Sequence, residues 1–174
     1  MMKRTIALLL VVFPAALGCG GGGSPAAPTP TISQVAGVWT GNVTQVSVTG
    51  GECLALFQQS NGGSDRYTLA LTQTGATLAA TAGSQNTGQS CTYTGTAGDG
   101  TISLNVATCE PGGYQATCNG QQRDVILFAR SVTATVNGSA MTGTVGESWN
   151  VFRRDERTNG LGIVTVNHTF TMTK

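Results

Sequence analysis

Five cysteines and one histidine carry the strongest side-chain chemistry of this sequence. Cys19 ends the run Ala15-Ala16-Leu17-Gly18-Cys19, and the others are Cys53, Cys91, Cys109 and Cys118. Apart from Cys19, four cysteines remain. An even number in an exported chain predicts disulfides, here two, with three alternative pairings. The sequence has no C-x-x-C motif and His168 is its single imidazole, so we expect no metal and no cofactor.

The spacing of the four later cysteines bears on their pairing. Cys109 and Cys118 bracket a short loop that could close on itself, which would leave Cys53 with Cys91. A two-residue turn at Asp99-Gly100 places Cys91 opposite Thr108, which disfavours Cys91 with Cys109 unless a bulge intervenes. All three pairings stay open at this point.

Catalytic chemistry finds little support. A Ser-His-Asp or Cys-His scheme would have to use His168, which sits within an apolar strand face and is explained as a buried neutral His with one hydrogen-bond partner. Two carboxylates could act as an acid and base pair on saccharides, but none are paired locally. They are Glu52, Asp65, Asp99, Glu110, Asp124, Glu147, Asp155 and Glu156. We predict no catalytic residue, and a hydrolase is the third hypothesis.

The first residues form an export leader. Lys3 and Arg4 precede an apolar run from Ile6 to Phe13, which is too short to span a membrane and is followed by small residues. Residues 1–18 are therefore predicted to be a cleaved signal peptide. Residues 19–34, rich in glycine and proline, are predicted to be a tether.

The end of the leader resembles a bacterial lipoprotein signal. The resemblance implies that Cys19 is lipidated and becomes the mature N-terminus. It also implies a membrane anchor in the bacterial cell envelope, at the outer membrane where the cell has one, because Gly20 rather than Asp follows the cysteine.

The charge composition excludes one class of partner. Charged residues make up 10% of the chain, against about 25% in an average soluble domain. Loss of Lys3 and Arg4 from the 9 basic residues leaves 7 against 8 acidic ones. Nucleic acid, which requires clustered positive charge, is therefore not an expected partner. The run 153–157 is the single charged cluster, either a solvated loop or a barrel-mouth loop that contacts an anionic ligand or head group.

Residues 35–174 read as one all-β domain. Two-residue alternation of Val, Leu and Thr, interrupted by turn residues, predicts eight strands. Their expected bounds are 37–48, 66–73, 76–82, 89–96, 101–108, 123–136, 139–151 and 162–173. Sequential hairpins favour an antiparallel up-and-down (meander) barrel, with a β-sandwich as the alternative. The stretch 53–58 is either one turn of helix or a strand.

Three hairpin turns set the predicted register. Turns at Thr74-Gly75, Asp99-Gly100 and Asn137-Gly138 pair Leu71 with Leu78, Ala97 with Ile102 and Ala134 with Met141. The segment 123–136 is predicted to be fully buried or to bulge near Arg130. The last strand is expected to place Val164, Val166, His168, Phe170 and Met172 on one face.

The first strand carries a family resemblance. Gly37-Val38-Trp39 at the start of an eight-stranded meander resembles the calycin pattern of lipocalins and similar barrels. The resemblance implies a barrel floor closed by Trp39, an Arg from near the C-terminus covering it, and an interior that holds small apolar ligands. The last strand has no Arg, and Arg153 and Arg154 are the nearest substitutes.

Two functions are predicted from this organisation. The first is a lipid-anchored, non-catalytic barrel that binds a small apolar or amphipathic ligand, because small inward residues such as Ala80 and Gly95 favour a cavity. Its predicted lining is Tyr67, Leu69, Leu71, Tyr93, Leu104, Met141 and Phe170, with His168 as a polar contact. The alternative is a structural or protein-interaction module of the envelope, with a packed core, no ligand and an envelope protein as partner.

Overall fold

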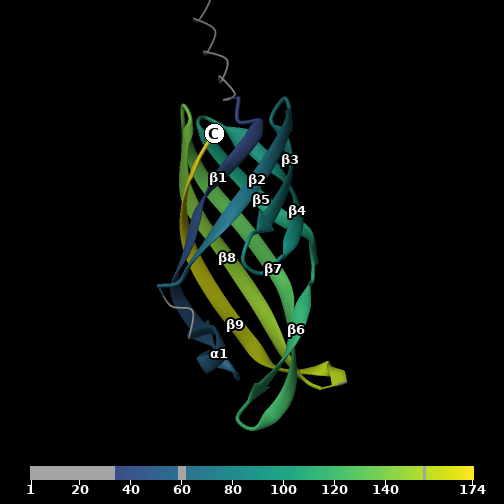
Figure 1. Cartoon of the computed structure of the whole chain (residues 1–174). Coiled ribbons are helices and arrows are strands. Elements are labelled where there is room, and N and C mark those ends of the chain that lie inside the picture. The colour runs from purple at the N-terminus through teal and green to yellow at the C-terminus, as the bar shows by residue number, and fades with distance from the viewer. Residues whose placement is uncertain (1–33, 59–61, 155) are drawn as a thin grey trace, which may run out of the picture.

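A closed antiparallel β-barrel forms the domain (Figure 1). The computed structural model describes residues 34–58, 62–154 and 156–174; the predicted leader, Cys19 and nearly all of the tether lie outside these ranges. The strands are β1 (Gly37–Gly50), β2 (Ser64–Thr74), β3 (Thr77–Ser84), β4 (Ser90–Gly98), β5 (Thr101–Glu110), β6 (Gly113–Cys118), β7 (Gln121–Asn137), β8 (Ala140–Arg153) and β9 (Glu156–Thr173). In the described ranges no helix has the length and apolar character needed to cross a membrane.

The strand order confirms the predicted up-and-down barrel. From β1 to β5, and again from β7 to β9, neighbouring strands in the sequence pair with each other, while β1 pairs with β9 and β5 with β7. These eight strands close the sheet on itself, which leaves no sandwich of two separate sheets. Closure removes the unpaired edges that an open sheet would expose.

The prediction missed one strand, β6. It pairs with residues 121–126 of β7, whereas β5 pairs with residues 131–135 of β7. The two strands β5 and β6 therefore pair with different parts of the same strand. The β6–β7 turn contains Asn119 and Gly120, with φ of 52° and 74°. Positive φ at both central residues is what a two-residue hairpin turn requires.

The predicted hairpin registers are correct in one case and displaced in two. Ala97 lies opposite Ile102 as expected. Leu71, however, lies opposite Ala80, and Ala134 lies opposite Gly143, because each of these turns falls one residue later than predicted. A displacement of two residues preserves the side-chain alternation, so the same residues still face the interior.

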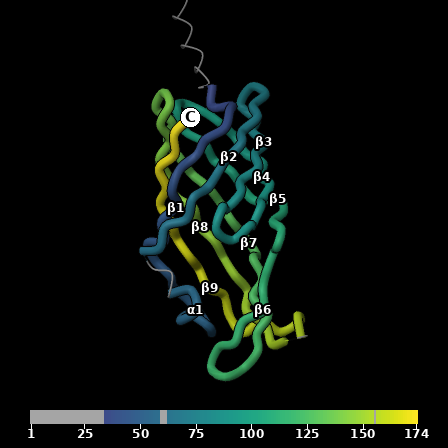
Figure 2. Tube along the Cα trace, in the orientation of Figure 1, coloured from purple at the N-terminus to yellow at the C-terminus, as the bar shows by residue number. Residues whose placement is uncertain are grey.

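Two further strand predictions are confirmed. β7 has a bulge between Leu127 and Ala129, next to Arg130, and Phe128 is the extra residue. β9 turns Val164, Val166, His168, Phe170 and Met172 toward the interior. The stretch 53–58 contains a helix, α1 (Leu54–Gln58), which lies at the lower end of the barrel (Figure 2).

The disulfides are Cys53–Cys118 and Cys91–Cys109. The pairing of Cys109 with Cys118, and with it Cys53 with Cys91, is therefore wrong. The register of β4 and β5 shifts between Thr92 and Tyr93, and this irregularity brings Cys91 directly opposite Cys109. The sequence disfavoured Cys91 with Cys109 unless a bulge intervened, and this register shift is that bulge.

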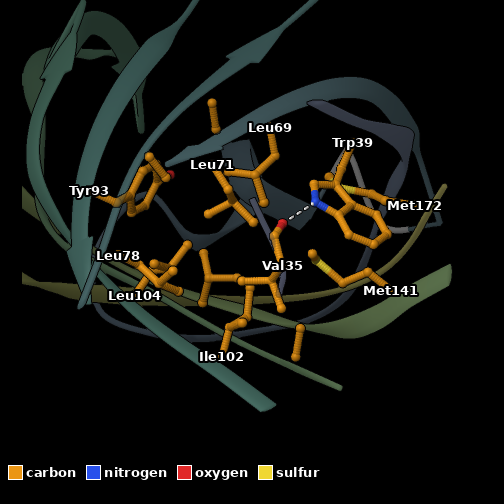
Figure 3. Packing of buried hydrophobic residues seen from close by; sticks show 14 of the residues in the cluster. Val35, Trp39, Leu69, Leu71, Leu78, Tyr93, Ile102, Leu104, Met141 and Met172 are labelled. Atoms are coloured by element: carbon orange, nitrogen blue, oxygen red, sulfur yellow. Dashed lines mark hydrogen bonds between the residues drawn. The ribbon is translucent and has the colours of Figure 1, made fainter. Parts of the chain in front are cut away.

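Trp39 closes the upper end of the barrel. Its side chain is fully buried among Val35, Met141 and Met172 (Figure 3), and its Nε1 donates to the Val35 carbonyl at 2.9 Å. The cation over its ring is Lys174, with Nζ 5.6 Å from the ring centroid. Arg153 and Arg154 do not cover it, because they lie where β8 ends at the opposite end of the barrel.

Candidate functional site

A layer of polar side chains crosses the barrel interior between two apolar clusters. The upper cluster surrounds Trp39, Leu78 and Leu104, and the lower cluster surrounds Trp149 and Val151. The polar layer consists of Arg130, Glu147, His168, Tyr67, Gln89 and Gln45. Their side chains bring charges and hydrogen-bonding groups into the interior, so the layer is the first candidate for a site.

Arg130 and Glu147 form the centre of the layer. They are cross-strand neighbours on β7 and β8, with Arg130 Nη2 2.9 Å from Glu147 Oε1 and side chains 4% and 8% exposed. Trp149 Nε1 donates to Glu147 Oε2 at 2.9 Å, and His168 Nε2 lies 3.6 Å from Glu147 Oε1. The carboxylate is thus held by Arg130 and Trp149, with the His168 imidazole close to it on a third side.

Burial and pairing act against each other on the ionisation of this pair. Burial alone would raise the pKa of Glu147, but His168, the charge of Arg130 and the Trp149 bond together hold that pKa below its usual range. Burial would lower the pKa of Arg130, but the Glu147 charge and the two tyrosines raise it above its ordinary value. Both groups are therefore ionised, and the pair is neutral as a unit.

Arg130 also connects several other strands. It donates to Gln89 Oε1 at 3.0 Å, to Tyr67 Oη at 3.1 Å and to Cys91 Sγ at 3.3 Å. Its guanidinium lies 5.5 Å from the centroid of the Tyr67 ring. Beside it, burial raises the pKa of Tyr93 to about 12. These non-covalent contacts hold Arg130 in place and connect separate parts of the barrel wall.

Arg130 borders a cavity inside the barrel. The cavity has a volume of about 20 Å³, and four predicted ligand residues line it: Tyr67, Leu69, Tyr93 and Phe170. A water needs about 10–15 Å³, whereas ligand pockets measure about 300–1,000 Å³. The cavity therefore has room for one water and not for a lipid.

The remaining predicted ligand residues do not border this cavity. Leu71, Leu104 and Met141 are packed in the upper cluster, and His168 belongs to the polar layer. Small inward residues leave no empty space either, since a Cβ on Gly95 or Gly143 would overlap the backbone of the neighbouring strand. There the strands approach each other closely.

The lower end of the barrel is plugged. Phe57 of α1 lies 5.9 Å from Trp149 between ring centroids, and Tyr114 meets the same ring at 5.8 Å. Gln45 donates to the Phe57 carbonyl at 2.8 Å. Cys53–Cys118 joins the segment before α1 to the end of β6. The mouth expected of a ligand-binding barrel is thus occupied by the chain itself.

The carboxylates suspected of acid and base chemistry mostly have structural partners. Arg123 bonds Glu52 at 2.6 Å, Ser84 bonds Asp65, and Asp99 occupies a turn with φ of 42°. Asp155 lies outside the described residues. Throughout the described ranges, no three His, Cys, Asp or Glu side chains are grouped so that they could hold a metal ion.

The outer wall carries larger hollows than the interior. Threonines dominate one of about 570 Å³ over β4, β5, β7 and β8, and one of about 380 Å³ over β1 and β9. A third, also about 380 Å³, lies over β6 and β7 and contains charged side chains. No sequence argument pointed to these surfaces, because each is assembled from several strands.

The fold and the interior define a class: a closed eight-stranded antiparallel barrel, consistent with a lipocalin-like barrel, whose interior is packed around a buried ion pair. Comparison with known protein families, with characterised proteins and with solved structures gives no match.

Proposed function

We propose that this chain is a lipid-anchored, non-catalytic binding module of the bacterial cell envelope, whose barrel is a rigid scaffold and whose outer surface binds the partner. The interior cavity of about 20 Å³ carries this proposal. It favours the module over the interior ligand carrier, because a carrier needs more than ten times that volume.

The contacts around the cavity support a scaffold role. Arg130, Glu147 and Trp149 hold one another in fixed positions. A ligand that entered between them would have to separate a buried ion pair and leave two charges without partners. The plug formed by α1 and the Cys53–Cys118 disulfide would also have to move.

Residues at the start of the sequence support the anchor. Lys3 and Arg4, the apolar run and Cys19 fit an export leader with a lipidated cysteine, and the glycine and proline residues after it fit a tether. Metabolic labelling with an alkyne fatty acid tests this part. We expect labelling and membrane association of the wild type, and loss of both in Cys19→Ser. A labelled Cys19→Ser variant would contradict the assignment.

Ligand uptake tests the scaffold against the carrier. Titration of the exported chain carrying Cys19→Ser with an apolar fluorescent dye and with C12 to C18 fatty acids should show no saturable binding. A matched variant, Phe170→Ala, removes a large side chain from the cavity wall and controls for detection, because engineered apolar cavities take up small apolar molecules. Stoichiometric binding of a fatty acid to the chain with Phe170 intact would favour the carrier.

A further inference from the structure

The hollow over β6 and β7 differs from the two threonine-rich hollows in its side chains. It has a volume of about 380 Å³ and is lined by residues that include Gly113, Gln115, Asp124, Ile126 and Arg157. That volume falls in the range of about 300–1,000 Å³ for small-molecule sites. The hollow is open to solvent, in contrast to the interior of the barrel.

Glycine and strand pairing create the floor of the hollow. Gly113 lies opposite Ile126, and a Cβ at Gly113 would contact the backbone of β7. No side chain therefore fills the space beside Ile126, whose half-buried side chain gives the floor an apolar part. An apolar floor with a polar rim suits a ligand that has both C–H and O–H groups.

Three planar polar side chains form a connected rim. Gln115 Nε2 donates to Asp124 Oδ1 at 3.1 Å, and Arg157 Nε lies 3.5 Å from Asp124 Oδ2, with side chains 71% and 5% exposed. The buried carboxylate thus orients an exposed amide and an exposed guanidinium. Gln115 keeps its carbonyl oxygen as an acceptor, and the two terminal nitrogens of Arg157 remain as donors.

The charge of the rim selects among ligands. Arg157 and Asp124 carry opposite charges and form an ion pair, so their sum is zero. An anion would gain from Arg157 but would be repelled by Asp124, whose Oδ2 lies 3.5 Å from Arg157 Nε. A neutral molecule with several hydroxyl groups meets no such conflict and can use donors and acceptors together.

We propose that this hollow binds a neutral saccharide, with Gln115 and Arg157 as contact residues and Asp124 as the residue that positions both. Hydroxyl groups bond the amide and the guanidinium, and the C–H face of the sugar ring lies on Ile126 and the glycine backbone. The proposal rests on the proposed function, in which the outer surface is the binding surface. It adds the ligand class and the location.

The test is an amide-resolved NMR titration of the exported chain carrying Cys19→Ser. The probes are maltotetraose, cellotetraose and chitotetraose as neutral saccharides, and acetate and phosphate as anions. We expect saturable shift changes centred on Gly113, Gln115 and Arg157 with at least one saccharide, and none with the anions. Arg157→Gln should weaken that binding about tenfold, since hydrogen bonds to a charged group are lost.

Two variants separate positioning from folding. Asp124→Asn keeps the side-chain shape but leaves Arg157 without its counter-charge, so saccharide binding should fall while acetate begins to bind. Asn42→Ala is the matched control for Gln115→Ala, because Asn42 lines the threonine-rich hollow of equal volume, about 380 Å³. Of these two alanine variants, Gln115→Ala should weaken saccharide binding and Asn42→Ala should leave it unchanged.

Three results would overturn the saccharide site: no saturable shift with any saccharide, equal shifts around Asn42, or binding of acetate alone by the chain with Asp124 intact. None of them touches the proposed function, which fails separately if the interior is found to hold a lipid.

Discussion

Replacing Glu147 by Gln should destabilise the barrel more than any surface substitution. The change keeps the side-chain shape but leaves Arg130, 4% exposed, without its counter-charge. Breaking a buried ion pair by removing one partner costs about 3–5 kcal/mol. For a domain of this size that corresponds to a fall in melting temperature of about 10–15 °C.

The comparison with two other variants makes this prediction specific. Glu156→Gln removes the exposed pair with Arg153, whose side chains are 65% and 43% exposed, and should cost less than about 0.5 kcal/mol. The double variant Arg130→Met with Glu147→Leu leaves no charge unpaired and should recover most of the stability lost in Glu147→Gln.

Urea unfolding with both disulfides intact measures these differences, with tryptophan fluorescence as the signal. The reasoning would be refuted if Glu147→Gln cost less than about 1 kcal/mol. It would also be refuted if the double variant were less stable than the single one, since the penalty would then not come from an unpaired buried charge.

Three further predictions concern pH, a disulfide and the closed end. The folded pKa of Glu147 is depressed, so its stabilisation is complete above the ordinary value of 4.5 and is lost as pH falls below it. In Arg130→Met the lowering effect of the Arg130 charge is gone, so the loss of stability relative to wild type should be smaller at about pH 4 than at about pH 7, measured by urea unfolding. Cys53 and Cys118 are 65 residues apart, and replacing both by Ser should cost up to about 4.3 kcal/mol by the chain-entropy relation, measured by urea unfolding. Lys174→Ala removes the cation over the Trp39 ring and should lower stability by about 0.5–1 kcal/mol, measured the same way.

The sequence predicted the architecture because alternation and turn residues are local signals. Val164 to Met172 alternate without interruption, and Asp99-Gly100 fixes its hairpin correctly. Local signals also existed for β6, since Asn119-Gly120 is a strong hairpin turn. The strand was missed because residues 113–118 contain few large apolar side chains.

The buried ion pair could not be predicted, because the predicted register of β7 and β8 was displaced by two residues. With the turn at Asn137-Gly138, Arg130 would face Val145. With the turn one residue later, as the structure has it, Arg130 faces Glu147. The Cys91–Cys109 disulfide was hidden in the same way by the irregularity at Thr92. Pairs across strands follow from register, and a bulge changes register without a distinct sequence signal.

The outer hollow could not be predicted, since it combines residues far apart in the chain. Gln115 and Asp124 meet through the β6–β7 hairpin, and Arg157 reaches them from β9. Arg157 was noted as part of a charged run, but its partner was visible only in the folded chain.

Native mass spectrometry of the chain purified from cell envelopes, after release of its lipid anchor, tests the central claim most directly. The packed interior predicts that no lipid is bound, so solvent extraction of the unfolded chain should yield none. A reproducible additional mass that is released on unfolding and is recovered by extraction as a lipid would contradict the scaffold account.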